Sequence, residues 1–159
     1  MNELEKQVLE SWGINHRVNL KLINAISEEA LDFTTSKRGG GKIGHQLAHL
    51  YNVRYWKMET IDKKLIEGHT TVKAKDPKSK QMLIDLHEVS ALWIEQAFEE
   101  AIQNGGHFKK GWKRGVVPLL SSIINHEAHH RGNILLTLKL CGFKLTNELK
   151  YGIWEWRKI

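Results

Sequence analysis

Two histidines one helical turn apart, His126 and His130, carry the clearest chemistry in this chain. They lie in an apolar run, residues 116–140, whose helical periodicity lets both imidazoles point the same way and share one metal ion. Burying two polar rings on a face otherwise made of leucine and isoleucine is costly unless the rings have a partner. The pair therefore predicts a metal site.

Helical angles place this pair at the core side of the predicted helix. With His126 at zero and about 100° per residue, the apolar residues fall between roughly 20° and 120°. His130 then falls at about 40°, Glu127 at about 100° and His129 at about 300°. A carboxylate in a core needs a partner, and a metal, a ligand histidine or an arginine would each supply one.

A second pair with the same spacing, His45 and His49, lies in the run at 43–67. With His49 at zero, the apolar face there spans roughly 40° to 160°, and His45 lies about 40° further out on the polar side. We therefore expect His49 to face the interior. Together with His126 and His130 it would form a three-histidine site with one coordination position open, as in catalytic metal sites.

The elements that must position these side chains are helices. Helical periodicity covers residues 3–26, residues 43–67, a third segment from Asp76-Pro77 to Asn104, and residues 116–141. Asp suits a helix N-cap and Pro the first helical position. Four such segments predict an all-α fold, a four-helix bundle. A short aromatic-rich C-terminal tail is expected to pack across it, with three large rings: Tyr151, Trp154 and Trp156.

Length and composition predict one globular domain over residues 1–159. No apolar run reaches the length of a membrane span, and the start of the chain lacks the layout of a signal peptide. We therefore expect a cytoplasmic protein without a membrane partner. The single cysteine, Cys141, has an apolar setting that predicts a packed thiol rather than a nucleophile. Four other histidines are expected to face solvent: His16, His69, His87 and His107.

The net charge of +6 raises the question of a nucleic-acid partner. The densest basic cluster, residues 109–114, surrounds Trp112 and could contact phosphates and stack on a base. The alternative is a solvated loop with its tryptophan packed against the bundle. So modest a charge excess favours the loop, and we expect no nucleic-acid partner.

Two blocks of the sequence together resemble the DinB-like family of metal-binding four-helix bundles. These are GHQLAHLYNVRYW at residues 44–56 and HEAHHRGNI at residues 126–134. The resemblance implies a divalent metal, nickel or zinc, held by His49, His126 and His130. It also implies a small-molecule substrate and a low-molecular-weight thiol cosubstrate, as in the thiol-dependent transferases and isomerases of the family. Asn133 stands where the family often has glutamine, which leaves the ligands unchanged.

The working hypothesis is a metal-dependent enzyme of the thiol transferase or hydrolase type. Glu127 would orient a ligand histidine or move a proton, and Asn15 and Arg131 are candidates for substrate contacts.

Two alternatives remain open. One is a non-catalytic metal-binding or stress-response bundle protein, and we expect a homodimer formed through its aromatic surfaces. The other is a zinc peptidase, because His126, Glu127 and His130 satisfy H-E-x-x-H with Glu127 as general base. Leu136 stands where the extended motif needs histidine, and Glu148, a distant substitute ligand, lies beyond the end of the helix.

Overall fold

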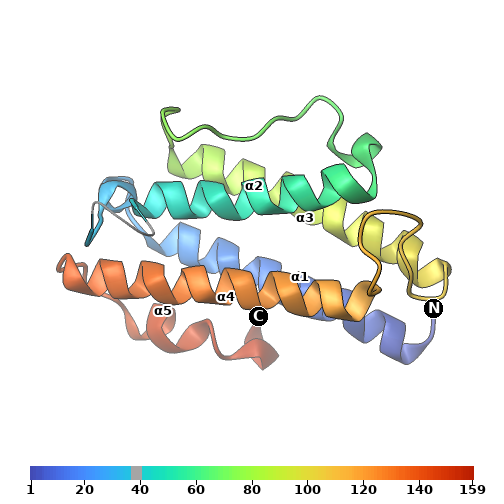
Figure 1. Ribbon diagram of the computed structural model, residues 1–159. Coiled ribbons are helices and arrows are strands. Elements are labelled where there is room, and N and C mark those ends of the chain that lie inside the picture. Colours follow the sequence, from blue (N-terminus) through green and yellow to red (C-terminus); the bar gives the residue numbers. More distant parts are fainter. Residues whose placement is uncertain (37–40) are drawn as a thin grey trace.

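The computed structural model describes residues 1–36 and 41–159, and within these ranges the chain is all α, without a strand. The bundle and its short tail are confirmed (Figure 1). Its four long helices are α1 (Glu3–Ala25), α2 (Ile43–Ile61), α3 (Lys80–Gln103) and α4 (Val116–Leu140). The shorter elements are the helix α5 (Asn147–Gly152) and the 3₁₀ turns η1 (Glu29–Asp32), η2 (Lys63–Ile66) and η3 (Trp156–Lys158).

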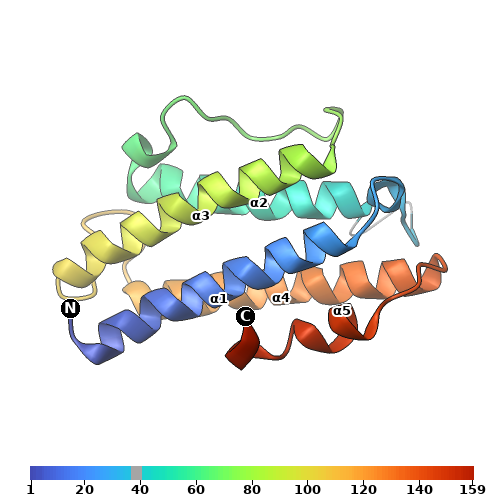
Figure 2. The same cartoon turned by 180° about the vertical axis from the view of Figure 1, so that it is seen from behind.

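The order of the helices in space puts α2 against α4. Figure 1 shows α1 and α4 running in one direction and α2 and α3 in the other, because the connection from α2 to α3 returns along the outside of the bundle. Figure 2, from behind, shows α1 beside α3 on the opposite side. Since α2 and α4 are antiparallel neighbours, the middle of one faces the middle of the other. The histidine pair, near the middle of α4, therefore meets residues near the middle of α2.

Two helix ends differ from the sequence-based prediction. Helix α2 ends at Ile61 rather than near residue 67, because Asp62 is extended (φ −152°) and its side chain accepts from the backbone N–H of Lys64, which starts η2. Helix α3 begins at Lys80, where Ser79 is the N-cap and its hydroxyl accepts from Met82 N–H.

The prediction that Asp76 caps the third helix is wrong, and the reason lies in the local hydrogen bonding of Asp76. Its carboxylate accepts from the N–H of Lys73 at 2.7 Å, so it closes a turn of the preceding connection instead. An Asp side chain bonds a nearby backbone N–H equally well in a turn or at a helix start.

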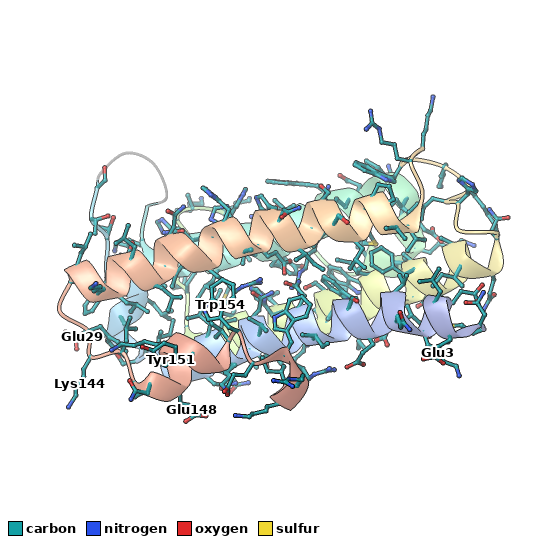
Figure 3. All side chains as sticks on the ribbon, turned by 90° about the horizontal axis from the view of Figure 1, so that it is seen from below. Glu3, Glu29, Lys144, Glu148, Tyr151 and Trp154 are labelled. Carbon is teal, nitrogen blue, oxygen red and sulfur yellow. The ribbon has the colours of Figure 1, made fainter. Side chains whose placement is uncertain are left out.

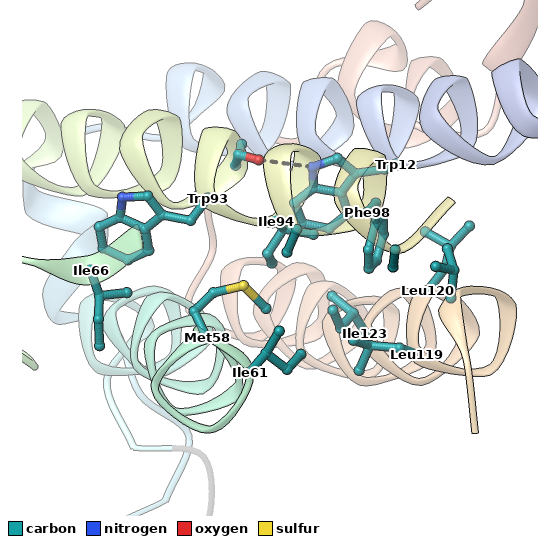
Figure 4. Packing of buried hydrophobic residues seen from close by; sticks show 14 of the residues in the cluster. Trp12, Met58, Ile61, Ile66, Trp93, Ile94, Phe98, Leu119, Leu120 and Ile123 are labelled. Atoms are coloured by element: carbon teal, nitrogen blue, oxygen red, sulfur yellow. Dashed lines mark hydrogen bonds between the residues drawn. The ribbon is translucent and has the colours of Figure 1, made fainter. Parts of the chain in front are cut away.

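The apolar core is divided along the bundle into two clusters. Figure 4 shows one of them, in which Trp12 packs with Phe98 and Ile123 and its indole N–H donates to the carbonyl of Ala91 at 3.1 Å. The other cluster is centred on Leu22, Leu47, Leu83 and Ile134. On α1, α3 and α4, buried polar residues come between members of the two clusters: Asn15, His87, Ser90 and Glu127. A polar layer thus crosses the middle of the core.

The C-terminal tail packs through aliphatic rather than aromatic side chains. Leu149 and Ile153 are buried in the second cluster, whereas Tyr151 and Trp154 lie on the outside of the tail (Figure 3). Trp156 is exposed as well, so the tail packs on the bundle as expected, but its three large aromatic rings do not provide the packing.

The expected packed thiol is also wrong, because Cys141 is exposed at the C-cap of α4. Its nearest polar partner is the carbonyl of Thr34, 3.8 Å from Sγ.

Among the described helices, none combines the length and apolar character that crossing a lipid bilayer would require.

Candidate metal centre

Three histidines converge between α2 and α4. His49 comes from α2, and His126 and His130 come from successive turns of α4. One ring nitrogen of each can be chosen so that all three nitrogens lie within 4.8 Å of one another. The ring centroids are 5.3 Å apart for His49 and His126, 5.0 Å for His49 and His130, and 4.8 Å for the pair on α4. Such a cluster could hold a metal ion.

Local structure explains why these three rings meet and His45 does not join them. Residues four apart project from the same side of a helix, so the α4 pair forms one edge of the cluster. His49 faces that edge from α2, whereas His45 lies one turn earlier and is not part of the cluster, although both histidines line a small hollow with Lys73 and Lys78. The angular argument from the sequence therefore chose the member of the α2 pair that the structure brings to the cluster.

Burial keeps the three imidazoles neutral. It lowers the pKa of His49, and burial followed by the charge of His49 lowers the pKa of His126. For His130, burial and then the neighbouring His126 lower the pKa to about 4. Only neutral imidazole has a lone pair to give to a metal, so at neutral pH all three rings are in the form a metal needs.

Internal hydrogen bonds satisfy the cluster only in part. Nδ1 of His126 is buried and has no hydrogen-bond partner. Nδ1 of His130 has one, the side-chain oxygen of Gln46 at 3.4 Å. An orphaned buried nitrogen costs free energy, so the one in this group of three imidazoles fits a metal site, although His16 and His87 outside the cluster each have one as well.

Glu127 has a different environment from its neighbours on α4. Its side chain is 1% exposed and its carboxylate faces Arg54, which donates through Nε at 2.7 Å and through Nη2 at 3.0 Å. Asn15 and Asn19 each donate to Oε2 at 2.6 Å. Burial alone would raise the pKa of Glu127, but the Arg54 guanidinium outweighs it and lowers that pKa to about 2. The sequence suggested a metal, a ligand histidine or an arginine as the partner of this carboxylate, and the structure shows an arginine, Arg54.

Asn15 and Arg131, the candidates for substrate contacts, belong to the same buried network. Arg131 donates through Nη1 to Asn15 Oδ1 at 2.9 Å and to Asn19 Oδ1 at 2.8 Å. Each amide therefore accepts from a cation and donates to the carboxylate of Glu127. All three side chains, Asn15, Arg131 and Glu127, are buried and face one another. The roles in a reaction that the sequence suggested for them stay predictions.

The residue that sequence reasoning missed is Arg54. It is fully buried on α2, lies 4.8 Å from the centroid of the Trp12 ring, and donates through Nη1 to Ser90 Oγ and to the carbonyl of His87, both at 3.1 Å. A signal was present: Arg54 falls about 140° from His49, inside the apolar arc of α2. A buried cation on one helix and a buried carboxylate on another predict a pair.

Two of the four histidines expected at the surface are not there. His87 is fully buried, with Nε2 3.0 Å from the carbonyl of Leu47, and burial followed by the charge of Arg54 lowers its pKa to about 3. His16 is half-buried, and the same two causes lower its pKa to about 4. His69 and His107 are exposed, as predicted.

The basic loop at 109–114 has the structure of a solvated loop. Lys109 and Lys110 are exposed, while Trp112 is half-buried against the first apolar cluster. The ammonium of Lys57 lies over the Trp112 ring, 5.2 Å from its centroid.

Fold and site together define an all-α bundle whose antiparallel helices α2 and α4 carry a three-histidine cluster that could hold a metal ion. Comparison with known families gives the same class: the model of the DinB family matches residues 1–148. The chain therefore belongs to the DinB family. No curated protein and no solved structure matches it.

Proposed function

We propose that this protein binds one divalent metal ion, nickel or zinc, through His49, His126 and His130. The observation that carries the proposal is the convergence of three neutral imidazoles whose nitrogens lie within 4.8 Å of one another. Imidazole is a ligand for both metals, and the absence of cysteine from the cluster distinguishes it from the usual structural zinc sites.

We further propose that the protein is a metal-dependent enzyme of the thiol transferase or hydrolase type, acting on a small-molecule substrate. Three protein ligands leave a position for a thiol or water, whose pKa the bound metal would lower. The half-buried rings are reachable from solvent, and Trp56, which is 46% exposed, stands edge-on to His49 at 6.3 Å. Its ring would give a substrate an apolar surface beside the metal.

The buried carboxylate argues against the peptidase alternative. A general base in an H-E-x-x-H site must face the metal-bound side, but the Glu127 carboxylate bonds Arg54, Asn15 and Asn19. Glu148 is exposed and pairs with Lys21, so it offers no fourth ligand. We propose instead that Glu127 holds α4 in position.

A non-catalytic metal-binding or stress-response protein is the second candidate, because among the described residues no carboxylate and no thiol joins the three histidines in the cluster. With either function we propose a cytoplasmic homodimer, for which exposed Leu136, Leu140 and Trp154 supply apolar surface.

The first experiment is the metal content of the untagged protein as purified, measured by mass spectrometry. About one nickel or zinc ion per chain is expected, and none in the double variant His126→Ala/His130→Ala. The matched control is His69→Ala/His107→Ala, which removes two exposed histidines and should leave the metal in place. Equal occupancy in both variants would contradict the site.

Turnover separates the two candidates. The metal-loaded protein is assayed with low-molecular-weight thiols and a panel of electrophiles, with the double variant as blank. Metal-dependent consumption of a thiol supports the enzyme, whereas full metal occupancy without turnover on any electrophile favours the binding protein.

A further inference from the structure

Gln46 is a buried amide on α2 whose one observed side-chain partner is a proposed metal ligand. It is 3% exposed, and its Oε1 lies 3.4 Å from Nδ1 of His130 on α4. Its neighbours Ile43, Leu47 and Leu50 are fully buried apolar residues. Burying an amide among such residues costs free energy unless the amide is hydrogen-bonded, so the contact with His130 offsets part of the cost of burying Gln46.

The chemistry of this contact selects one form of the imidazole. An amide oxygen can only accept a hydrogen bond, so the facing Nδ1 must carry the proton. A neutral imidazole has one N–H and one lone pair, and the lone pair of His130 is then on Nε2, free for a metal. An amide turned the other way would donate to Nδ1, put the proton on Nε2 and remove that ligand atom.

His126 shows what the cluster is like without such a partner. Its Nδ1 is buried and unbonded, so no side chain selects its tautomer before an ion arrives. His130, by contrast, faces Gln46 across the α2–α4 contact. Gln46 and His49 lie three residues apart, so α2 presents both of them toward α4. His49 faces the proposed metal position, and Gln46 faces Nδ1 of His130.

We propose that Gln46 is a positioning residue of the metal site: it accepts from Nδ1–H of His130 and so fixes that ring with Nε2 as its ligand atom. The inference rests on the proposed metal site. Partners of this kind orient a ligand ring and raise its basicity, and their loss typically weakens metal binding about 10- to 100-fold.

The first test needs no metal. Two-bond ¹H–¹⁵N correlation spectra of the metal-free protein at pH 7 report which nitrogen of His130 carries the proton, with His130→Gln used to assign its signals. The Nδ1–H form is expected to dominate in the native chain and to give way to a mixture in Gln46→Met. An Nε2–H ring in the native chain overturns the proposal, whatever the protein does with metal.

The second test is metal affinity, measured by competition between zinc and a chromophoric chelator. Gln46→Met should weaken binding about 10-fold or more, while Gln46→Glu, which keeps an acceptor oxygen, should bind within about threefold of the native chain. The matched control is Gln81→Met, an exposed glutamine of α3. Native affinity in Gln46→Met overturns the proposal.

The two tests distinguish a failure of the proposed metal site from a failure of the proposed role of Gln46. If the native chain takes up no zinc, the proposed function fails, but the tautomer of His130 still decides what Gln46 does. If zinc binds and Gln46→Met binds it equally, only the role of Gln46 is lost. If Gln46→Met does not fold, the native tautomer and the zinc affinity of Gln46→Glu still decide.

Discussion

The three-histidine cluster and the buried ionic network share helices α2 and α4, and the network also includes Asn15 and Asn19 of α1. On α4, His126 and His130 face the cluster, and the residues that follow them, Glu127 and Arg131, face the network. One residue is about 100° of rotation, so α4 presents two polar edges side by side. Helix α2 also contributes to both regions, through His49 and Arg54, which are five residues and about 140° apart.

The two regions differ in how far the protein satisfies them. The carboxylate of Glu127 accepts from Arg54, Asn15 and Asn19 and is closed to solvent. The cluster is half-buried, and a buried nitrogen of His126 is left without a partner. A polar group that the fold satisfies internally holds the fold together, while lone pairs that the fold gathers and leaves free are available to a ligand.

The largest effect is expected from breaking the network. Glu127→Ala leaves the guanidinium of Arg54 buried without its anion, which should lower the free energy of unfolding by ~3–5 kcal/mol. Urea denaturation of the metal-free protein measures this, with the exposed Glu95→Ala on α3 as control. A loss below about 1 kcal/mol would mean that the network does not hold the bundle together.

Metal should stabilise the native chain by a smaller amount, and only through the cluster. At 100 times Kd, a ligand that binds only the folded state adds about 2.7 kcal/mol, which raises the melting temperature by several degrees. His130→Ala should abolish the zinc-dependent shift, while His129→Ala, an exposed neighbour, should keep it. A shift that persists in His130→Ala would place the metal elsewhere.

Acid should weaken the network through His87. Burial lowers its folded pKa from 6.5 to about 3, so the unfolded chain binds the proton first and stability falls as pH drops below about 6.5. From pH 7 to 5 this amounts to about 2 kcal/mol. Glu127, whose folded pKa is also lowered, adds a further loss only below about pH 4.5.

The variant His87→Gln isolates that contribution. Because glutamine does not titrate, its unfolding free energy should depend less on pH between 7 and 5 than that of the native chain. Guanidinium denaturation at the two pH values measures the difference. Parallel pH profiles for the two proteins would assign the acid sensitivity to other groups.

The smallest effect is expected outside both regions, in the basic loop. Lys109→Ala/Lys110→Ala removes two exposed charges and should change the free energy of unfolding by less than about 0.5 kcal/mol. Trp112→Ala should cost more, since its ring packs against the first apolar cluster. Thermal unfolding of both variants compares the two losses of stability. A larger loss in Lys109→Ala/Lys110→Ala than in Trp112→Ala would contradict the prediction.

Periodicity was sufficient to predict the bundle and the convergence of its histidines, because a repeat near 3.6 residues fixes which side chains share a face. The same arcs contain Arg54 and Glu127, so their pairing was within reach of the sequence. The burial of His87 was within reach too, because it falls about 40° from Leu83, between Ile94 and Phe98 on the buried arc of α3, but its bond to the carbonyl of Leu47 on another helix was not. Nor was the start of α3, where Asp76 and Ser79 are both competent caps and only Ser79 is used.

The placement of the histidines on α2 and α4 also sets an order of events during biosynthesis. The pair on α4 becomes available as soon as that helix forms, but His49 joins it only when two segments from distant parts of the sequence have docked. Closing so long a stretch of chain is a late step in assembly. The complete set of three imidazoles therefore exists only in the assembled bundle, so on the proposed function the bound ion would report that the chain has completed its folding.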